Sequence, residues 1–94
     1  MKLLTKELEK RFEKIGSQEG SENPIVIARY FCPWNNWNWY ATEYNSETKV
    51  FFGYVIGFEK EWGYFSLEEL GQMGIKIERD LYCGEKPLSD IVKK

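Results

Sequence analysis

The first part of the chain carries one apolar stripe with the spacing of a helix. The stripe consists of Leu4, Leu8, Phe12 and Ile15, which follow one another at intervals of four, four and three residues. Because an α-helix has about 3.6 residues per turn, these side chains fall on one face. Thr5 suits the N-cap, Gly16 ends the pattern, and the polar stretch Ser17–Pro24 is typical of a loop. The sequence predicts an amphipathic N-terminal helix followed by a surface loop.

The pattern changes after this loop, where β-branched and aromatic residues replace the charged ones. Three runs have the composition of strands, namely Ile25–Cys32, Trp37–Tyr44 and Lys49–Phe58, and Gly63–Phe65 continues the pattern. The connection Asn45–Thr48 is short enough for a hairpin and too short for a parallel crossover. We therefore expect the second and third runs to pair as antiparallel neighbours.

The last third of the chain contains two short helices and one more strand. Ser66 and Glu69 form a capping box, which predicts a short helix that begins there. Ile75–Cys83 has the pattern of a final strand, and Pro87 can begin a short terminal helix. We expect a single α+β domain over residues 1–94, with a small antiparallel sheet of three to five strands, an N-terminal helix and two short helices.

Aromatic residues are concentrated in the predicted sheet, because fourteen of the sixteen lie between Tyr30 and Phe65. The second strand directs Trp37, Trp39, Ala41 and Glu43 to one face, and Asn38, Tyr40, Thr42 and Tyr44 to the other. A half-exposed sheet should instead alternate apolar and polar residues. Either helices cover both faces of the sheet, or one face is an exposed apolar patch that binds a partner.

Tryptophans are the first candidates for such a patch. The candidate binding residues are Trp34, Trp37, Trp39 and Trp62. Trp34 and Trp37 flank the turn at Asn35 and Asn36, where other elements provide least cover. Aromatic side chains are the usual anchors of protein interfaces, so we expect some of these four to be accessible to solvent.

The charge and composition exclude several function classes. Thirteen basic and fifteen acidic residues give a net charge of −2, which argues against a nucleic-acid partner. The sequence has no apolar run of signal-peptide or membrane-span length, so we expect no membrane association and a cytoplasmic location. Cys32 and Cys83 suit reduced thiols in that compartment. Histidine is absent, which removes the commonest general base and the commonest metal ligand.

Two charged residues interrupt the apolar rows. Glu43 shares a predicted strand face with Trp37 and Trp39, and Arg79 shares one with Ile77 and Leu81. We predict that Glu43 and Arg79 form a charge-assisted pair. The pair could fix the strand register, or it could provide a polar spot in an aromatic cleft.

Carboxylates offer the only basis for an enzymatic alternative. Glu78 and Asp80 lie two residues apart on the strand face opposite Arg79, and two carboxylates can bind Mg²⁺ or act as acid and base. The alternative function is a carboxylate- or metal-dependent enzyme that uses Glu43, Glu78, Asp80 and Arg79. Without a third ligand or a histidine, solvated strand charges are the preferred interpretation of Glu78 and Asp80.

Several ordered sequence blocks resemble a known family. WYATE (Trp39–Glu43), FFGYV (Phe51–Val55), GYFSLEEL (Gly63–Leu70) and IERDLY (Ile77–Tyr82) occur here in that order, followed by KPLSD (Lys86–Asp90). Together they resemble the domain of unknown function 2958 family. The resemblance implies a bacterial origin, often on plasmids, conjugative elements or phages, and it implies no activity, ligand or catalytic residue. The segment Glu68–Lys76 is shorter than its counterpart in the family.

The preferred functional hypothesis is a binding protein rather than an enzyme. We expect a small non-enzymatic accessory factor of a mobile genetic element or a bacterial genome. It would bind another protein or a second copy of itself through part of the aromatic sheet. No cofactor, metal or catalytic residue is predicted.

Overall fold

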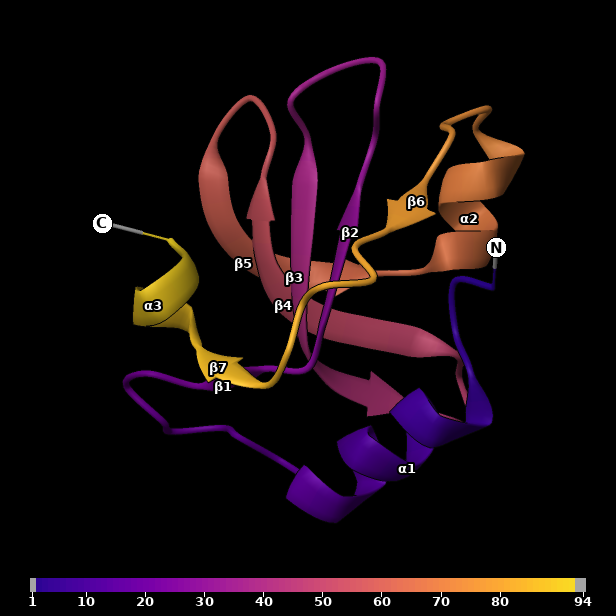
Figure 1. Ribbon diagram of the computed structural model, residues 1–94. Coiled ribbons are helices and arrows are strands. Elements are labelled where there is room, and N and C mark those ends of the chain that lie inside the picture. Colours follow the sequence, from indigo (N-terminus) through magenta and orange to yellow (C-terminus); the bar gives the residue numbers. More distant parts are fainter. Residues whose placement is uncertain (1, 93–94) are drawn as a thin grey trace.

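A computed structural model describes residues 2–92 of the chain (Figure 1). The elements are α1 Lys6–Ile15, β1 Ile25–Val26, β2 Ala28–Phe31, β3 Asn38–Asn45, β4 Val50–Ile56, β5 Lys60–Phe65, α2 Leu67–Gln72, β6 Glu78–Arg79, β7 Lys86–Pro87 and α3 Leu88–Ile91. Five strands form one antiparallel sheet in the order β5-β4-β3-β2-β6, and β1 pairs with β7 in a small second sheet. The α+β prediction is confirmed.

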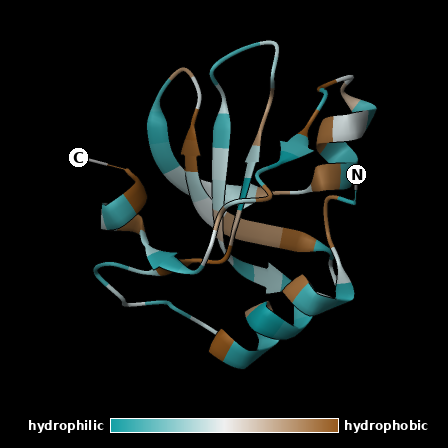
Figure 2. Cartoon of the chain, in the orientation of Figure 1, coloured by the Kyte–Doolittle hydropathy of each residue, from teal (hydrophilic) through white to brown (hydrophobic). Residues whose placement is uncertain are grey.

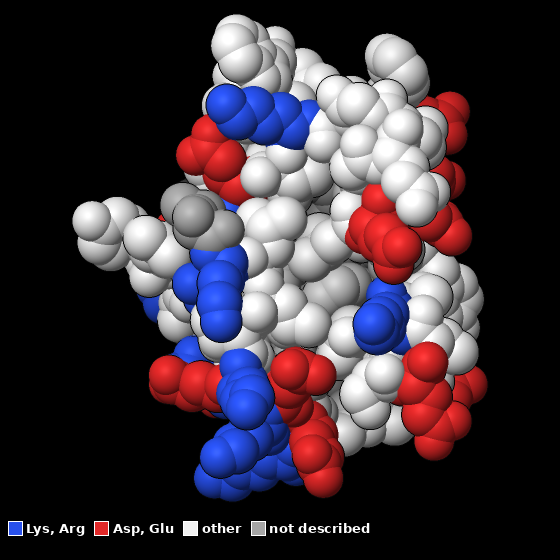
Figure 3. Space-filling model, turned by 90° about the vertical axis from the view of Figure 1, so that its right-hand side faces the viewer, with Lys and Arg blue, Asp and Glu red and all other residues white. Residues whose placement is uncertain are grey.

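The N-terminal helix begins and ends where the sequence predicts. The Thr5 hydroxyl accepts a hydrogen bond from the Leu8 backbone N–H at 3.1 Å, and Gly16 ends the helix with a φ of 70°. Leu8 and Phe12 are buried against the sheet, while the outer face of α1 carries charge. Figure 2 shows the largely hydrophilic ribbon of α1, and Figure 3 shows basic and acidic side chains gathered over it at the bottom of the molecule.

Strands β3 and β4 form the predicted antiparallel hairpin. Asn45 lies opposite Val50, and the Asn45 side-chain oxygen accepts hydrogen bonds from the backbone N–H groups of Glu47 and Thr48. Hydrogen bonds in which an asparagine side chain accepts from nearby backbone N–H groups stabilise tight turns. Lys49 adopts a φ of 59° to complete the turn.

A β-bulge at Thr42 reverses the side-chain alternation within β3. Ala41 lies opposite Gly53 and Glu43 lies opposite Phe52, so Thr42 is an extra residue. Thr42 is buried, and its hydroxyl donates to the Phe52 carbonyl oxygen at 3.2 Å. The prediction that Glu43 shares a face with Trp37 and Trp39 is therefore wrong.

Helices lie on both sides of the main sheet and divide the core into two clusters. In Figure 1, α2 lies to the right of the sheet and α1 lies below it, and both pack against a cluster that includes Tyr30, Phe51 and Phe65. On the other side, α3 places Leu88 against Tyr40 and Tyr54 in a smaller cluster. Because α3 spans only Leu88–Ile91, it covers less of the sheet than α1.

Two predicted strands are shorter than expected. The first splits into β1 and β2 at Ile27, where β1 turns to pair with β7. The last is reduced to Glu78–Arg79, because the Asp80 side chain accepts a hydrogen bond from the Tyr82 backbone N–H and begins a turn. Leu81 is consequently exposed rather than part of an apolar row.

Candidate binding surface

The four candidate tryptophans do not form one patch. Trp39 is buried in the larger cluster, and Trp37 is half-buried with its ring centroid 5.8 Å from that of Trp39. Trp34 is 77% exposed at the β2–β3 turn, with the Lys76 ammonium 5.7 Å from its ring centroid. Trp62 is 39% exposed in β5 and lies on the opposite face of the sheet from Trp39. The structure therefore brings only Trp37 and Trp39 together.

A different aromatic group forms a continuous surface across β4 and β5. It consists of Phe52, Tyr54, Trp62 and Tyr64, and we call it the β4–β5 strip. Phe52 lies opposite Tyr64 and Tyr54 lies opposite Trp62, with ring centroids 4.9 Å and 5.2 Å apart. The Phe52 and Trp62 rings stack across the diagonal at 5.8 Å. Cross-strand neighbours of this kind stabilise a sheet.

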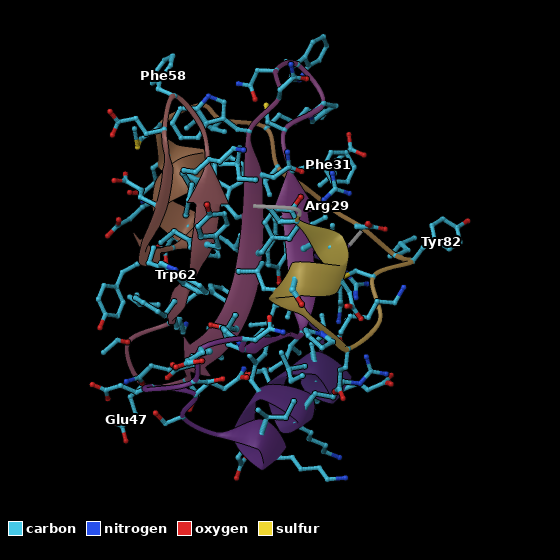
Figure 4. All side chains as sticks on the ribbon, turned by 90° about the vertical axis from the view of Figure 1, so that its left-hand side faces the viewer. Arg29, Phe31, Glu47, Phe58, Trp62 and Tyr82 are labelled. Carbon is cyan, nitrogen blue, oxygen red and sulfur yellow. The ribbon has the colours of Figure 1, made fainter. Side chains whose placement is uncertain are left out.

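Half of this strip is open to solvent because of its position in the sheet. Tyr54 is buried beneath the cluster that contains α3, whereas Tyr64 is 78% exposed. Figure 4 shows α3 in front of β2 and β3, while Trp62 lies on the uncovered side of the molecule. Strand β5 is also an edge of the sheet, and within residues 2–92 no further strand pairs with its outer side. The sequence prediction missed Phe52 and Tyr64, although their alternation with Phe51 and Phe65 was visible.

The open half of the strip is one wall of a groove. Two adjoining hollows of about 570 Å³ and about 290 Å³ share Glu43, Phe52 and Tyr64 as lining residues. We call them together the β3–β5 groove. The first extends toward the end of α1 and the β3–β4 turn, and the second is closed by Gln18–Ser21.

The loop that closes the groove is fixed by one side chain. The Gln18 amide donates to the backbone carbonyl oxygens of Ile25 and Thr42, each at 2.8 Å, and its oxygen accepts from the Ile25 N–H. Gln18 thus ties the loop to the bulge. Because the bulge also directs Glu43 to the strip side of the sheet, both walls of the groove are held in place by the same local structure.

The charged side chains that line this groove are all acidic. Its lining includes Glu13, Glu19, Glu43 and Glu47, and no lysine or arginine among residues 2–92. Glu43 is half-buried, and within the described part of the chain its carboxylate has no ion-pair partner. The groove is therefore acidic and aromatic.

Glu43 and Arg79 lie in different parts of the sheet. Arg79 lies opposite Tyr30, which in turn lies opposite Trp39, whereas Glu43 is beyond the bulge and opposite Phe52. Among residues 2–92, the structure does not bring the two side chains of the predicted pair together. The bulge is the physical reason, since it directs Glu43 away from the face that Arg79 shares with Tyr30.

A charge-assisted pair is formed instead by Arg29 of β2 and Asp80, which follows β6. The Arg29 Nη1 lies 2.9 Å from the Asp80 Oδ2, and the Arg29 Nε donates to the Asn38 Oδ1 at 2.9 Å. The guanidinium carbon also lies 4.9 Å from the Phe31 ring centroid and 6.0 Å from that of Tyr40. Arg29 was the one cation of the first predicted strand, which was the available signal.

Of the groups named in the enzymatic alternative, Asp80 takes part in hydrogen bonds within the fold. Asp80 accepts from Arg29 through one oxygen and from the Tyr82 N–H through the other. Among residues 2–92, no three His, Cys, Asp or Glu side chains are grouped to hold a metal ion. Burial, followed by the nearby Asp80 carboxylate, raises the pKa of the Cys83 thiol, which disfavours the reactive thiolate.

The fold and this surface define a small α+β protein with an aromatic, acidic groove at one edge of its sheet. The chain belongs to the family described as Protein of unknown function (DUF2958), whose model matches residues 3–94, so the resemblance in the sequence blocks is confirmed. Neither the curated proteins nor the solved structures contain a match to the chain. In the described residues, none of the helices has the length and apolar composition to cross a membrane.

Proposed function

We propose that this chain is a non-enzymatic accessory protein that binds another protein through the β4–β5 strip. The observation that carries the proposal is the exposure of Tyr64 and Trp62, at 78% and 39%, side by side with Phe52 on a face that α3 leaves open. Contiguous exposed aromatics typically mark an interface, since they bury a large apolar area at a low cost in side-chain entropy.

The open half of the strip, at Trp62 and Tyr64, lies outside both core clusters. The buried rings of Tyr30, Phe51 and Phe65 already pack against one another on the α1 side, with centroids between 5.2 Å and 6.5 Å apart. Tyr64, in contrast, is mostly in water and adds little to folding. A partner that covers the strip would remove this apolar area from solvent, which is favourable.

The family resemblance supports a setting for this role. The resemblance implies a bacterial origin, often on plasmids, conjugative elements or phages. We therefore expect the partner to be a protein of the bacterial host or of the element itself. On this proposal the chain acts in the bacterial cytoplasm.

Affinity capture with matched tyrosine variants tests the proposal. Tyr64→Ser removes an exposed tyrosine from the strip, and Tyr82→Ser removes a 96% exposed tyrosine that lies far from it (Figure 4). We expect a host protein to be captured by the wild-type chain and by Tyr82→Ser, and to be lost with Tyr64→Ser. Equal capture by all three chains would contradict the proposal. Sedimentation of the purified chains separates self-association from binding to a different protein.

A further inference from the structure

The chemistry of the β3–β5 groove points to the kind of partner that it binds. We propose that the groove binds an extended protein segment that carries lysine or arginine side chains, an inference that rests on the proposed function. At least one cation of this segment lies against the β4–β5 strip and pairs with Glu43.

Charge complementarity is the first argument. Four glutamates line the groove and no lysine or arginine among residues 2–92 does so, although the whole chain has thirteen basic and fifteen acidic residues. The separation of charge is therefore local to the groove. Carboxylates gathered along one cleft produce a negative potential there, which attracts cations and repels nucleic acid.

The state of Glu43 is the second argument. Its carboxylate is half-buried beside Phe52, and within the described residues it has no ion-pair partner. A partly buried charge without a partner is costly, and a cation supplied by a bound segment would remove this cost.

Elsewhere on the same face of the sheet, a cation of this chain already occupies a similar setting. There Arg29 pairs with Asp80 and lies over the Phe31 ring, so one carboxylate and one aromatic ring hold a guanidinium. Glu43 and Phe52 present the same two groups in the groove, where residues 2–92 supply no cation. The sheet therefore contains one occupied and one open version of the same arrangement.

The shape of the groove favours a protein segment over a metal ion. Its glutamates come from α1, the 17–24 loop, β3 and the β3–β4 turn, and no three acidic or sulfur ligands among residues 2–92 are close enough to hold a metal. Carboxylates spread along an open groove suit several basic side chains on one extended chain. The edge strand β5 beside the groove also offers backbone groups for such a chain to pair with.

Binding of short labelled peptides to the full chain tests the inference. The probes are an eight-residue peptide of alternating arginine and alanine, the same peptide with glutamine in place of arginine, and one with glutamate. Fluorescence anisotropy of the label and chemical shifts of the Glu43 and Trp62 backbone amides are the readouts. We expect the arginine peptide to bind and shift both amides, with weaker binding at high salt, and the other two peptides to bind at least about tenfold more weakly.

A matched pair of variants locates the site. Glu43→Gln keeps the side-chain shape and removes the groove charge, whereas Glu61→Gln removes an exposed charge of β5 that does not line the groove. We expect Glu43→Gln to weaken binding of the arginine peptide about tenfold and Glu61→Gln to change it little. Equal effects of the two variants, or equal binding of the arginine and glutamine peptides, would overturn the inference.

A failure of this inference can be distinguished from a failure of the proposed function. If Tyr64→Ser loses its captured partner while the arginine peptide binds no better than the glutamine peptide, the strip is an interface but its partner is not basic. If the captured partner is indifferent to Tyr64→Ser, the proposed function itself is wrong.

Discussion

Arg29 and Asp80 join the two strands at one edge of the sheet, with the Arg29 Nη1 2.9 Å from the Asp80 Oδ2. Asp80 also donates its backbone N–H to the Arg29 carbonyl oxygen at 2.9 Å, so the two residues are linked through both main chain and side chain. Because β6 contains only Glu78 and Arg79, this link supplies much of what holds the segment to β2.

Loss of the Arg29 side chain should therefore destabilise the fold. We expect Arg29→Met to lower the free energy of unfolding by about 2 kcal/mol, because Asp80 would keep a partly buried charge without its hydrogen-bond donor. Urea unfolding measures the change. Arg11→Met is the control, since the Arg11–Glu7 pair is exposed on α1 and contributes about 0.5 kcal/mol. Equal losses in the two variants would show that the Arg29 pair has no special structural role.

Two glycines that face each other across β4 and β5 should respond differently to a methyl group. A Cβ added to Gly53 would lie 2.0 Å from the Tyr40 carbonyl oxygen, whereas one added to Gly63 would meet no atom within 4 Å. We expect Gly53→Ala to cost about 3 kcal/mol or to prevent folding, because the backbone of β3 must move. Gly63→Ala should be close to neutral. Thermal unfolding of both variants checks this, and similar melting temperatures would contradict the close approach of β3 and β4.

Tyr30 should make the stability depend on alkaline pH. Burial raises the pKa of its phenol above the usual 10.0, and the phenol donates to the Leu3 carbonyl oxygen at 2.6 Å. Above pH 10 the unfolded chain loses this proton while the folded chain keeps it, so the folded state binds more protons and stability falls as pH rises. Urea unfolding between pH 8 and pH 11 should show this loss.

Tyr30→Phe provides the matched control for the alkaline loss. The variant lacks the titrating group, so we expect lower stability at neutral pH, from the lost hydrogen bond, and a weaker fall above pH 10. If the wild-type chain and the variant lose stability in parallel over this pH range, the alkaline loss comes from groups other than Tyr30.

The sequence was sufficient to predict the main helices and the strand pairing of the hairpin, but not the details of the surface. Apolar spacing and capping residues predicted α1 and α2, and the short Asn45–Thr48 connection predicted the β3–β4 hairpin. The bulge at Thr42 has no sequence signal of this kind, since it depends on how two strands and the Gln18 side chain meet.

That single residue accounts for the main error at the candidate site. Strict alternation through β3 placed Glu43 with Trp39, whereas the bulge places it with Phe52. The exposure of Tyr64 was also beyond the sequence, because it depends on how far α3 extends over its face of the sheet. Trp39 is buried in the cluster on the opposite face, which includes Leu8 and Phe12 of α1. Which aromatic side chains are exposed depends on the strand register and on the distant elements that cover the sheet, rather than on the local sequence pattern.

Tyr64 and Phe65 are consecutive residues of β5 that should separate binding from folding. Their side chains point to opposite faces, and they are 78% and 7% exposed. Phe65 stacks on Phe51 with centroids 5.2 Å apart, so Phe65→Ala should leave a cavity and cost about 3–5 kcal/mol. Tyr64→Ala removes a ring that is mostly hydrated already, so we expect a change within about 0.5 kcal/mol. Urea unfolding of the two variants gives the comparison. A large loss with Tyr64→Ala would mean that the strip stabilises the fold, and partner loss with that variant would then no longer identify a binding surface.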